Sequence, residues 1–262
     1  MAFKIFNPIS FIFLIFILLA PIGHAKRSTP SDKNSSPFDF IKKLKALKTY
    51  QENYHMKPSC VVDDATISKL ITPRCGVPDI VNGINYMQPR GKKHNIHTVS
   101  HYSFFKGNPK WPSTKTHLTY RFLSNVPTYA IAPVAGAFQK WESSTHFTFA
   151  RVQTNQNSDL EIGFFRGDHG DGIQNAFDEK SIAHASAPPG GRFHYDADDK
   201  WSVEPAADAF HLETVALHEI GHLLGFGHSL INAAIMYSTF SHGEVKILNA
   251  DDIAGIRALY NR

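Results

Sequence analysis

The sequence predicts an α+β fold, because helical and strand patterns are mixed in the part of the chain after about residue 99. Four apolar residues fall on one helical face, the spacing of a helix packed on one side: Val134, Ala137, Phe138 and Trp141. Short runs typical of strands surround them, at 119–122, 147–150 and 160–164. Two further helices are expected at 209–225 and 249–260. With 42% apolar residues in a chain of 262, a core can form, which excludes a disordered protein.

The N-terminal segment has the features of a signal peptide. Lys4 precedes an unbroken apolar run, Phe11–Ala20, which is too short to span a membrane. Small residues at Gly23 and Ala25 then offer a cleavage site. We therefore expect residues 1–25 to be removed and the chain to be secreted to the extracellular space, whether cell wall, apoplast or matrix. A type II membrane anchor is the alternative.

Residues 26–98 are expected to form a small helical region that ends in a linker. Apolar residues recur at helical spacing within 40–56, and a shorter helix is expected at 63–71. Residues 80–98 are rich in Gly, Asn and basic residues, as linkers are. The main domain is therefore expected at 99–262. Within it, the Gly-, Asp-, His- and Pro-rich stretch 166–200 suggests little regular structure and a functional or ion-binding role.

The most informative string is residues 218–228, HEIGHLLGFGH. His218 and His222 are four residues apart, so on a helix they share one face and can bind one ion. Gly225 can adopt positive φ, which lets the chain turn back and bring His228 in as a third ligand. Three neutral imidazoles with one open position are typical of a catalytic zinc. Such a zinc activates water, and Glu219 is placed to accept the proton and return it to a leaving amine.

This string resembles the extended zinc-binding signature of the metzincins. Met236, eight residues after His228, resembles the methionine turn of that clan. Ser229 suggests the matrix metalloproteinase branch, and residues 73–79, PRCGVPD, match the cysteine-switch motif of its propeptides. The segment 101–111 before the first strand is similar to plant members, and we expect no hemopexin-like domain.

The resemblance implies a metzincin catalytic domain with a twisted, mostly parallel five-stranded sheet and three helices, preceded by a small helical propeptide. It implies zinc-dependent hydrolysis of peptide bonds in extracellular proteins, with an extended substrate added as a strand beside the edge of the sheet. Cys75 would be the fourth zinc ligand that keeps a zymogen latent, since a thiolate binds zinc strongly. Arg74 and Asp79 are expected to pair and hold its loop. A Cys60–Cys75 disulfide is the alternative for this even pair of cysteines.

A second zinc is expected in the stretch 166–200. Three histidines and one aspartate form a closed tetrahedral set, as a structural zinc requires, and their order resembles the second zinc site of matrixins: His169, Asp171, His184 and His194. A solvated loop is the alternative for histidines in such a segment.

A structural calcium is also implied, with Asp196 and Asp199 in the family's carboxylate positions. Here the sequence departs from the family, because the glycines of the expected loop are absent and Asp178 is displaced. The calcium site is either distorted or filled by Lys180. A second departure lies upstream, where we find two helices and not the family's three. A smaller propeptide buries less apolar surface, so we expect leaky latency.

The net charge of +4 hides two opposite parts. Residues 1–99 contain 14 basic and 6 acidic residues, whereas 100–262 contain 13 and 17. The basic excess lies in segments expected to be removed, so it indicates no nucleic-acid partner. We expect a monomer that binds extended peptide or protein substrates and has no membrane span once mature. A secreted zinc-stabilised binding protein or a decoy for protease inhibitors, both without turnover, is the competing class, against which Glu219 argues.

Overall fold

The computed structural model of the chain describes residues 37–54, 56–81, 84–87, 101–178 and 180–261. It divides into two compact units, 1–69 and 70–262, which are described separately. The expected signal peptide lies outside the described residues. Within the described ranges, no helix combines the length and the apolar character that crossing a membrane requires.

The first unit contains two expected helices, α2 (Pro37–Asn53) and α3 (Asp64–Leu70). The Asp63 side chain starts α3 by accepting a hydrogen bond of 2.8 Å from the Thr66 backbone N–H. A polar contact joins the helices, because the buried Gln51 Nε2 donates to Thr66 Oγ1 at 3.0 Å. Both helices lie close to their predicted ranges, so the apolar spacing was a sufficient guide to them.

The second unit is built on a six-stranded sheet in the order β1-β7-β8-β6-β4-β5. All neighbouring pairs are parallel except β7 and β8. The strands are β1 (Arg74–Cys75), β4 (His117–Phe122), β5 (Thr148–Arg151), β6 (Leu160–Phe165), β7 (Ser181–Ala185) and β8 (Arg192–Asp196). Five of them belong to the expected catalytic part, so the mostly parallel five-stranded sheet is confirmed. The sixth, β1, is the segment that carries Cys75.

The stretch 166–200 is more regular than we expected, and that expectation was wrong. It contains β7, β8 and a 3-10 turn at Ile173–Asn175. Both strands are short, and histidines occupy positions where apolar residues would mark a buried strand. His184 and His194 face each other across the antiparallel pair and are buried. Burial of polar ligands therefore concealed the strand pattern.

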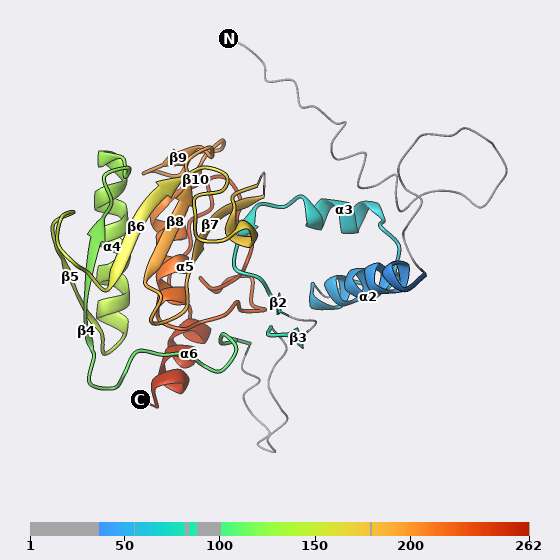
Figure 1. Cartoon of the computed structure of the whole chain (residues 1–262), viewed down its shortest axis with the longest axis horizontal. Helices are drawn as coiled ribbons and strands as arrows, with labels where there is room; N and C mark the ends of the chain where they lie inside the picture. The colour runs from blue at the N-terminus through green and yellow to red at the C-terminus, as the bar shows by residue number, and fades with distance from the viewer. Residues whose placement is uncertain (1–36, 55, 82–83, 88–100, 179, 262) are drawn as a thin grey trace, which may run out of the picture. The chain divides into compact units, whose positions relative to one another are not determined.

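Helices α4 (Thr128–Ser144) and α5 (Leu212–Leu223) pack together against one face of the sheet (Figure 1). The four residues expected on one face of α4 are all buried, and Trp141 Nε1 donates to the Leu217 backbone oxygen on α5 at 2.8 Å. All residues of α5 except Glu213 are buried. This helix starts later than predicted because Phe210–His211 forms β10, which pairs with β9 (Trp201–Ser202).

Helix α6 (Ala250–Tyr260) begins with a capping box between Asn249 and Asp252. Asp252 is fully buried, and its carboxylate also accepts hydrogen bonds from the backbone N–H groups of Ile235 and Met236, at 3.0 and 3.2 Å. The same side chain therefore starts the last helix and holds the turn that contains Met236.

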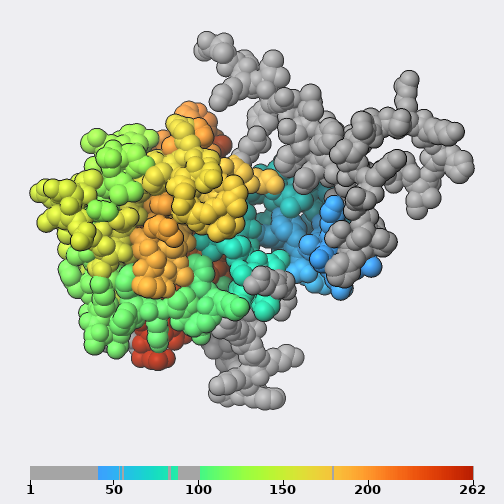
Figure 2. Space-filling model, viewed as in Figure 1, coloured from blue at the N-terminus to red at the C-terminus, as the bar shows by residue number. Residues whose placement is uncertain are grey.

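The residues before the catalytic part are less linker-like than expected. Strand β2 (Ile80–Val81) pairs antiparallel with β3 (Ile84–Asn85), and Met87 is 3% exposed. Residues 82–83 and 88–98 of the expected linker lie outside the described residues. The second unit begins at residue 70. In Figure 2, the teal atoms of its first residues lie against the yellow atoms of the region around β7, with which β1 pairs.

Two helical glycines provide a test of this packing. A Cβ at Gly221 in α5 would collide with Met236 Sδ and lie 3.3 Å from the Trp141 ring, whereas a Cβ at Gly136 in α4 would meet only the end of the flexible Glu213 side chain. Gly221→Ala should lower the free energy of unfolding by about 1–3 kcal/mol through overpacking. Gly136→Ala should be neutral or stabilising by up to about 1 kcal/mol, because alanine favours helix.

Urea unfolding of both variants measures the difference. Equal stabilities would contradict the close contact between α5 and the Met236 turn.

Candidate metal centres and active site

His218 and His222 lie on one face of α5 with their inner nitrogens turned toward each other. Each Nδ1 donates to a backbone carbonyl oxygen, His218 to Ile235 at 2.7 Å and His222 to Phe226 at 2.8 Å. Each Nε2 is therefore left with a lone pair, and the two Nε2 atoms are 3.0 Å apart. Two lone pairs at this distance repel unless a cation lies beside them, so the pair fits a metal ion.

The chain turns back after α5 and brings His228 to the same place. Gly225 has φ of 107°, a conformation that favours glycine, and a Cβ there would approach the Pro109 backbone oxygen to 2.5 Å. His228 is 2% exposed, and its Nε2 has no hydrogen-bond partner among the residues that the structure describes. A buried imidazole nitrogen without a partner is unfavourable, and a metal ion would satisfy it.

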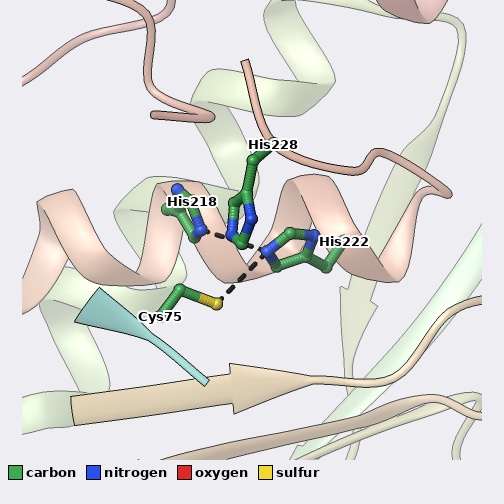
Figure 3. A group of neighbouring side chains, drawn as sticks. All are labelled: Cys75, His218, His222 and His228. Atoms are coloured by element: carbon green, nitrogen blue, oxygen red, sulfur yellow. Dashed lines mark hydrogen bonds between the residues drawn. The ribbon is translucent and has the colours of Figure 1, made fainter. Parts of the chain in front are cut away.

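Cys75 completes this group from the opposite side (Figure 3). Its Sγ is 3.3 Å from His222 Nε2, and the residue is fully buried. One ligand atom from each of the four residues lies within 4.8 Å of the others: Cys75, His218, His222 and His228. Burial, followed by the charge of Glu219, raises the pKa of the thiol. A thiolate is therefore stable here only beside a cation, and the donor set fits zinc.

The loop around Cys75 is held as expected. Arg74 Nη2 is 2.8 Å from Asp79 Oδ2, so the predicted pair is confirmed. The structure adds a contact that the motif did not reveal, 2.6 Å between Asp79 Oδ1 and His228 Nδ1. Both cysteines are free, without the alternative disulfide.

Glu219 lies beside the cluster as a buried carboxyl group. It is fully buried, and neither oxygen has a hydrogen-bond partner among the described residues. Burial raises its pKa to about 8. An ionised carboxylate in this position needs a nearby positive charge, which a bound metal ion supplies.

The second predicted set also converges. His169, Asp171, His184 and His194 place one ligand atom each within 4.8 Å of the others. Asp171 Oδ2 lies 3.0 Å from His184 Nε2 and 3.3 Å from His194 Nδ1. Burial lowers the pKa of both histidines, that of His194 to about 3, so their imidazoles are neutral. Within the described ranges, His194 Nδ1 and His169 Nε2 have no hydrogen-bond partner, which fits a closed metal site.

The three aspartates expected to bind calcium do not form a comparable cluster among the described residues. Asp178 Oδ1 accepts hydrogen bonds from the backbone N–H groups of Lys180 and Ser181, both at 2.9 Å. Burial and neighbouring carboxylates raise the pKa of Asp196 to about 6 and that of Asp199 to about 7. These carboxylates are therefore close enough to repel, and a cation would relieve the repulsion.

Together, the mostly parallel sheet, the buried helix with two histidines and the turn that returns a third define the metzincin class. The family model for matrixins matches residues 110–261. The chain therefore belongs to the matrixin family, whose members are zinc-dependent peptidases.

Curated relatives agree with this assignment. The chain is 40% identical to Metalloendoproteinase 2-MMP of Arabidopsis thaliana, over 88% of this chain and 66% of that protein. It is 40% identical to Metalloendoproteinase 1 of Glycine max, over 83% of this chain and 72% of that protein. Interstitial collagenase of Oryctolagus cuniculus is 35% identical, over 83% of this chain and 43% of the collagenase. The chain thus spans about two thirds of the length of the plant relatives, and the expected resemblance to plant members is confirmed.

Removal of one ligand from the second cluster should cost one metal equivalent. His194→Ala should bind one zinc fewer than the parent chain and unfold at a lower temperature. The reason is that an ion present at about 100 times its dissociation constant stabilises the folded state by about 2.7 kcal/mol. His242→Ala, an exposed histidine outside both clusters, is the control. Elemental analysis and thermal unfolding measure both quantities, and an unchanged zinc content in His194→Ala would contradict the site.

Proposed function

We propose that the chain is a secreted zinc-dependent endopeptidase, made as a latent zymogen, that hydrolyses peptide bonds of extracellular proteins. The observation that carries this proposal is the convergence of Cys75, His218, His222 and His228 beside an unpartnered carboxyl group, Glu219. Residues 1–25 would be the signal peptide, 26–98 the propeptide and 99–262 the catalytic domain, which we expect to act as a monomer.

In this proposal, His218, His222 and His228 hold the catalytic zinc. When bound there, zinc would supply the Lewis acidity that acidifies a water and polarises the scissile carbonyl. Glu219 accepts the proton of the attacking water and returns it to the leaving amine. The backbone carbonyls of Ile235 and Phe226 keep the His218 and His222 rings oriented through their Nδ1 atoms.

The segment around Cys75 supports an extended-peptide substrate. On one side, the backbone N–H groups of Arg74 and Gly76 donate to carbonyl oxygens of Lys180 and Ala183, at 2.9 and 2.8 Å. On the other side, Cys75 N donates to Ser238 O at 2.9 Å and Phe240 N to Pro73 O at 3.0 Å. A strand can therefore lie between β7 and residues 238–240 with both of its edges hydrogen-bonded, next to the three histidines.

The same geometry supports latency and a structural role for the other ions. Cys75 occupies the position that a water needs beside the three imidazoles, so the segment must leave before turnover. His169, Asp171, His184 and His194 would hold a structural zinc, since four protein ligands leave no open position. Asp178, Asp196 and Asp199 would contribute to a calcium site, with Lys180 as the alternative occupant.

The role of Glu219 can be tested without loss of the metal. Glu219→Gln in the proteolytically processed chain should keep both zinc ions but lower kcat by about 100-fold or more, because an amide cannot accept the proton. Glu213→Gln, in the first turn of the same helix, should remain active. A quenched fluorescent peptide measures turnover, and a zinc chelator should abolish it. Intact turnover in Glu219→Gln would contradict the mechanism, and zinc binding without turnover in the parent would favour the binding or decoy class.

Latency can be tested in the unprocessed chain. Cys75→Ser should raise its peptidase activity, because a serine hydroxyl is a much weaker zinc ligand than a thiolate. Cys60→Ser is the matched control and should leave activity unchanged. The parent zymogen should show residual activity if its small propeptide holds the switch weakly. A fully silent zymogen beside an active Cys75→Ser variant would contradict leaky latency but support the switch.

A further inference from the structure

The three imidazoles of the proposed catalytic site do not receive the same support at their outer nitrogens. His218 and His222 each donate from Nδ1 to a neutral backbone carbonyl, at 2.7 and 2.8 Å. His228 Nδ1 instead lies 2.6 Å from a carboxylate oxygen of Asp79. That carboxylate is 149 residues away in the sequence and belongs to the segment that activation would remove. The third ligand is therefore oriented by the proposed propeptide.

The contact is buried and charged. Asp79 and His228 have side chains 5% and 1% exposed, and Arg74 Nη2 holds the second carboxylate oxygen at 2.8 Å. Asp79, paired with the Arg74 guanidinium, is therefore a buried, charge-assisted acceptor for His228 that water does not screen.

A charged acceptor on the outer nitrogen changes how an imidazole binds a metal. It fixes the ring orientation and increases the electron density at the inner nitrogen, which makes the ligand more basic. Loss of such a partner usually weakens metal binding by about 10- to 100-fold. The inner nitrogen of His228, Nε2, has no hydrogen-bond partner in the described part of the chain, so this strengthening would act on a metal ion.

We propose that Asp79 is a positioning residue for the catalytic zinc in the latent chain, and that the propeptide uses it to load and retain this ion. The proposal rests on the zinc site of the proposed function but not on turnover. It predicts that the latent chain binds its catalytic zinc more tightly than a chain without this carboxylate. Cys75 and Asp79 would then contribute separately to zinc binding, although both belong to one segment. Cys75 would bind the ion directly, and Asp79 would hold His228 in position.

The experiment measures zinc affinity in the full-length chain by competition with a chelator, in a Glu219→Gln background that prevents self-cleavage. Asp79→Ala removes the acceptor, whereas Asp79→Asn retains a neutral one. Asp159→Asn is the matched control. This partly buried carboxylate also pairs with a basic side chain, Lys115, and accepts a hydrogen bond from the Thr119 backbone N–H, but it lies outside both clusters. The second zinc serves as an internal reference, since its four ligands do not include Asp79.

We expect Asp79→Ala to weaken one of the two zinc sites by about 10- to 100-fold, Asp79→Asn to weaken it less, and Asp159→Asn to leave both unchanged. The measurement is repeated in a Cys75→Ser background. This separates an effect of Asp79 through His228 from an effect through the placement of the Cys75 thiolate. If Asp79 acts through His228, the loss persists without the thiol. Far-ultraviolet circular dichroism confirms that each variant is folded.

Unchanged zinc affinity in folded Asp79→Ala would overturn the proposal. A loss that disappears in the Cys75→Ser background would also overturn it, because Asp79 would then serve only to place the thiolate. A loss at both zinc sites would indicate general destabilisation and would likewise count against it. Tight zinc binding that depends on Asp79 in a chain whose processed form cleaves no peptide would support the inference while rejecting the proposed function.

Discussion

The buried meeting point of three imidazole nitrogens and a thiol is the constraint on which the rest of the second unit depends. These groups lie within 4.8 Å of one another and are almost completely buried. Without a cation, the lone pairs of the His218 and His222 Nε2 atoms repel, and the buried His228 Nε2 has no hydrogen-bond partner among the described residues. The fold can keep such groups together only if it is rigid and if a bound ion compensates the free-energy cost of their repulsion and burial.

A series of hydrogen bonds from α5 to α6 provides this rigidity. His218 donates to the carbonyl of Ile235, and the N–H of Ile235 donates to the buried Asp252. Asp252 also caps α6, so the start of the last helix supports a ligand on α5. On the other side of α5, the Trp141 indole binds the Leu217 carbonyl. Packing and hydrogen bonding thus both limit the movement of the ligands, which a metal site requires.

Much of this could be predicted because the relevant patterns are local. The i, i+4 spacing of His218 and His222 places both on one face of any helix, and Gly225 marks the turn that returns His228. Strands β7 and β8 were missed for a related reason. Their buried positions include His184 and His194, and a pattern that treats histidine as polar cannot distinguish a buried ligand from a solvated loop.

The residues that bear the chemistry were therefore determined by the sequence, because their type and spacing limit which ion they can bind and on which face of a helix. Only the tertiary structure decided what supports them. The entry of Arg74–Cys75 into the sheet beside β7, and the contact of Asp79 with His228, join segments far apart in the chain. Such contacts depend on how strands and turns pack together, and short-range periodicity contains no information about that packing.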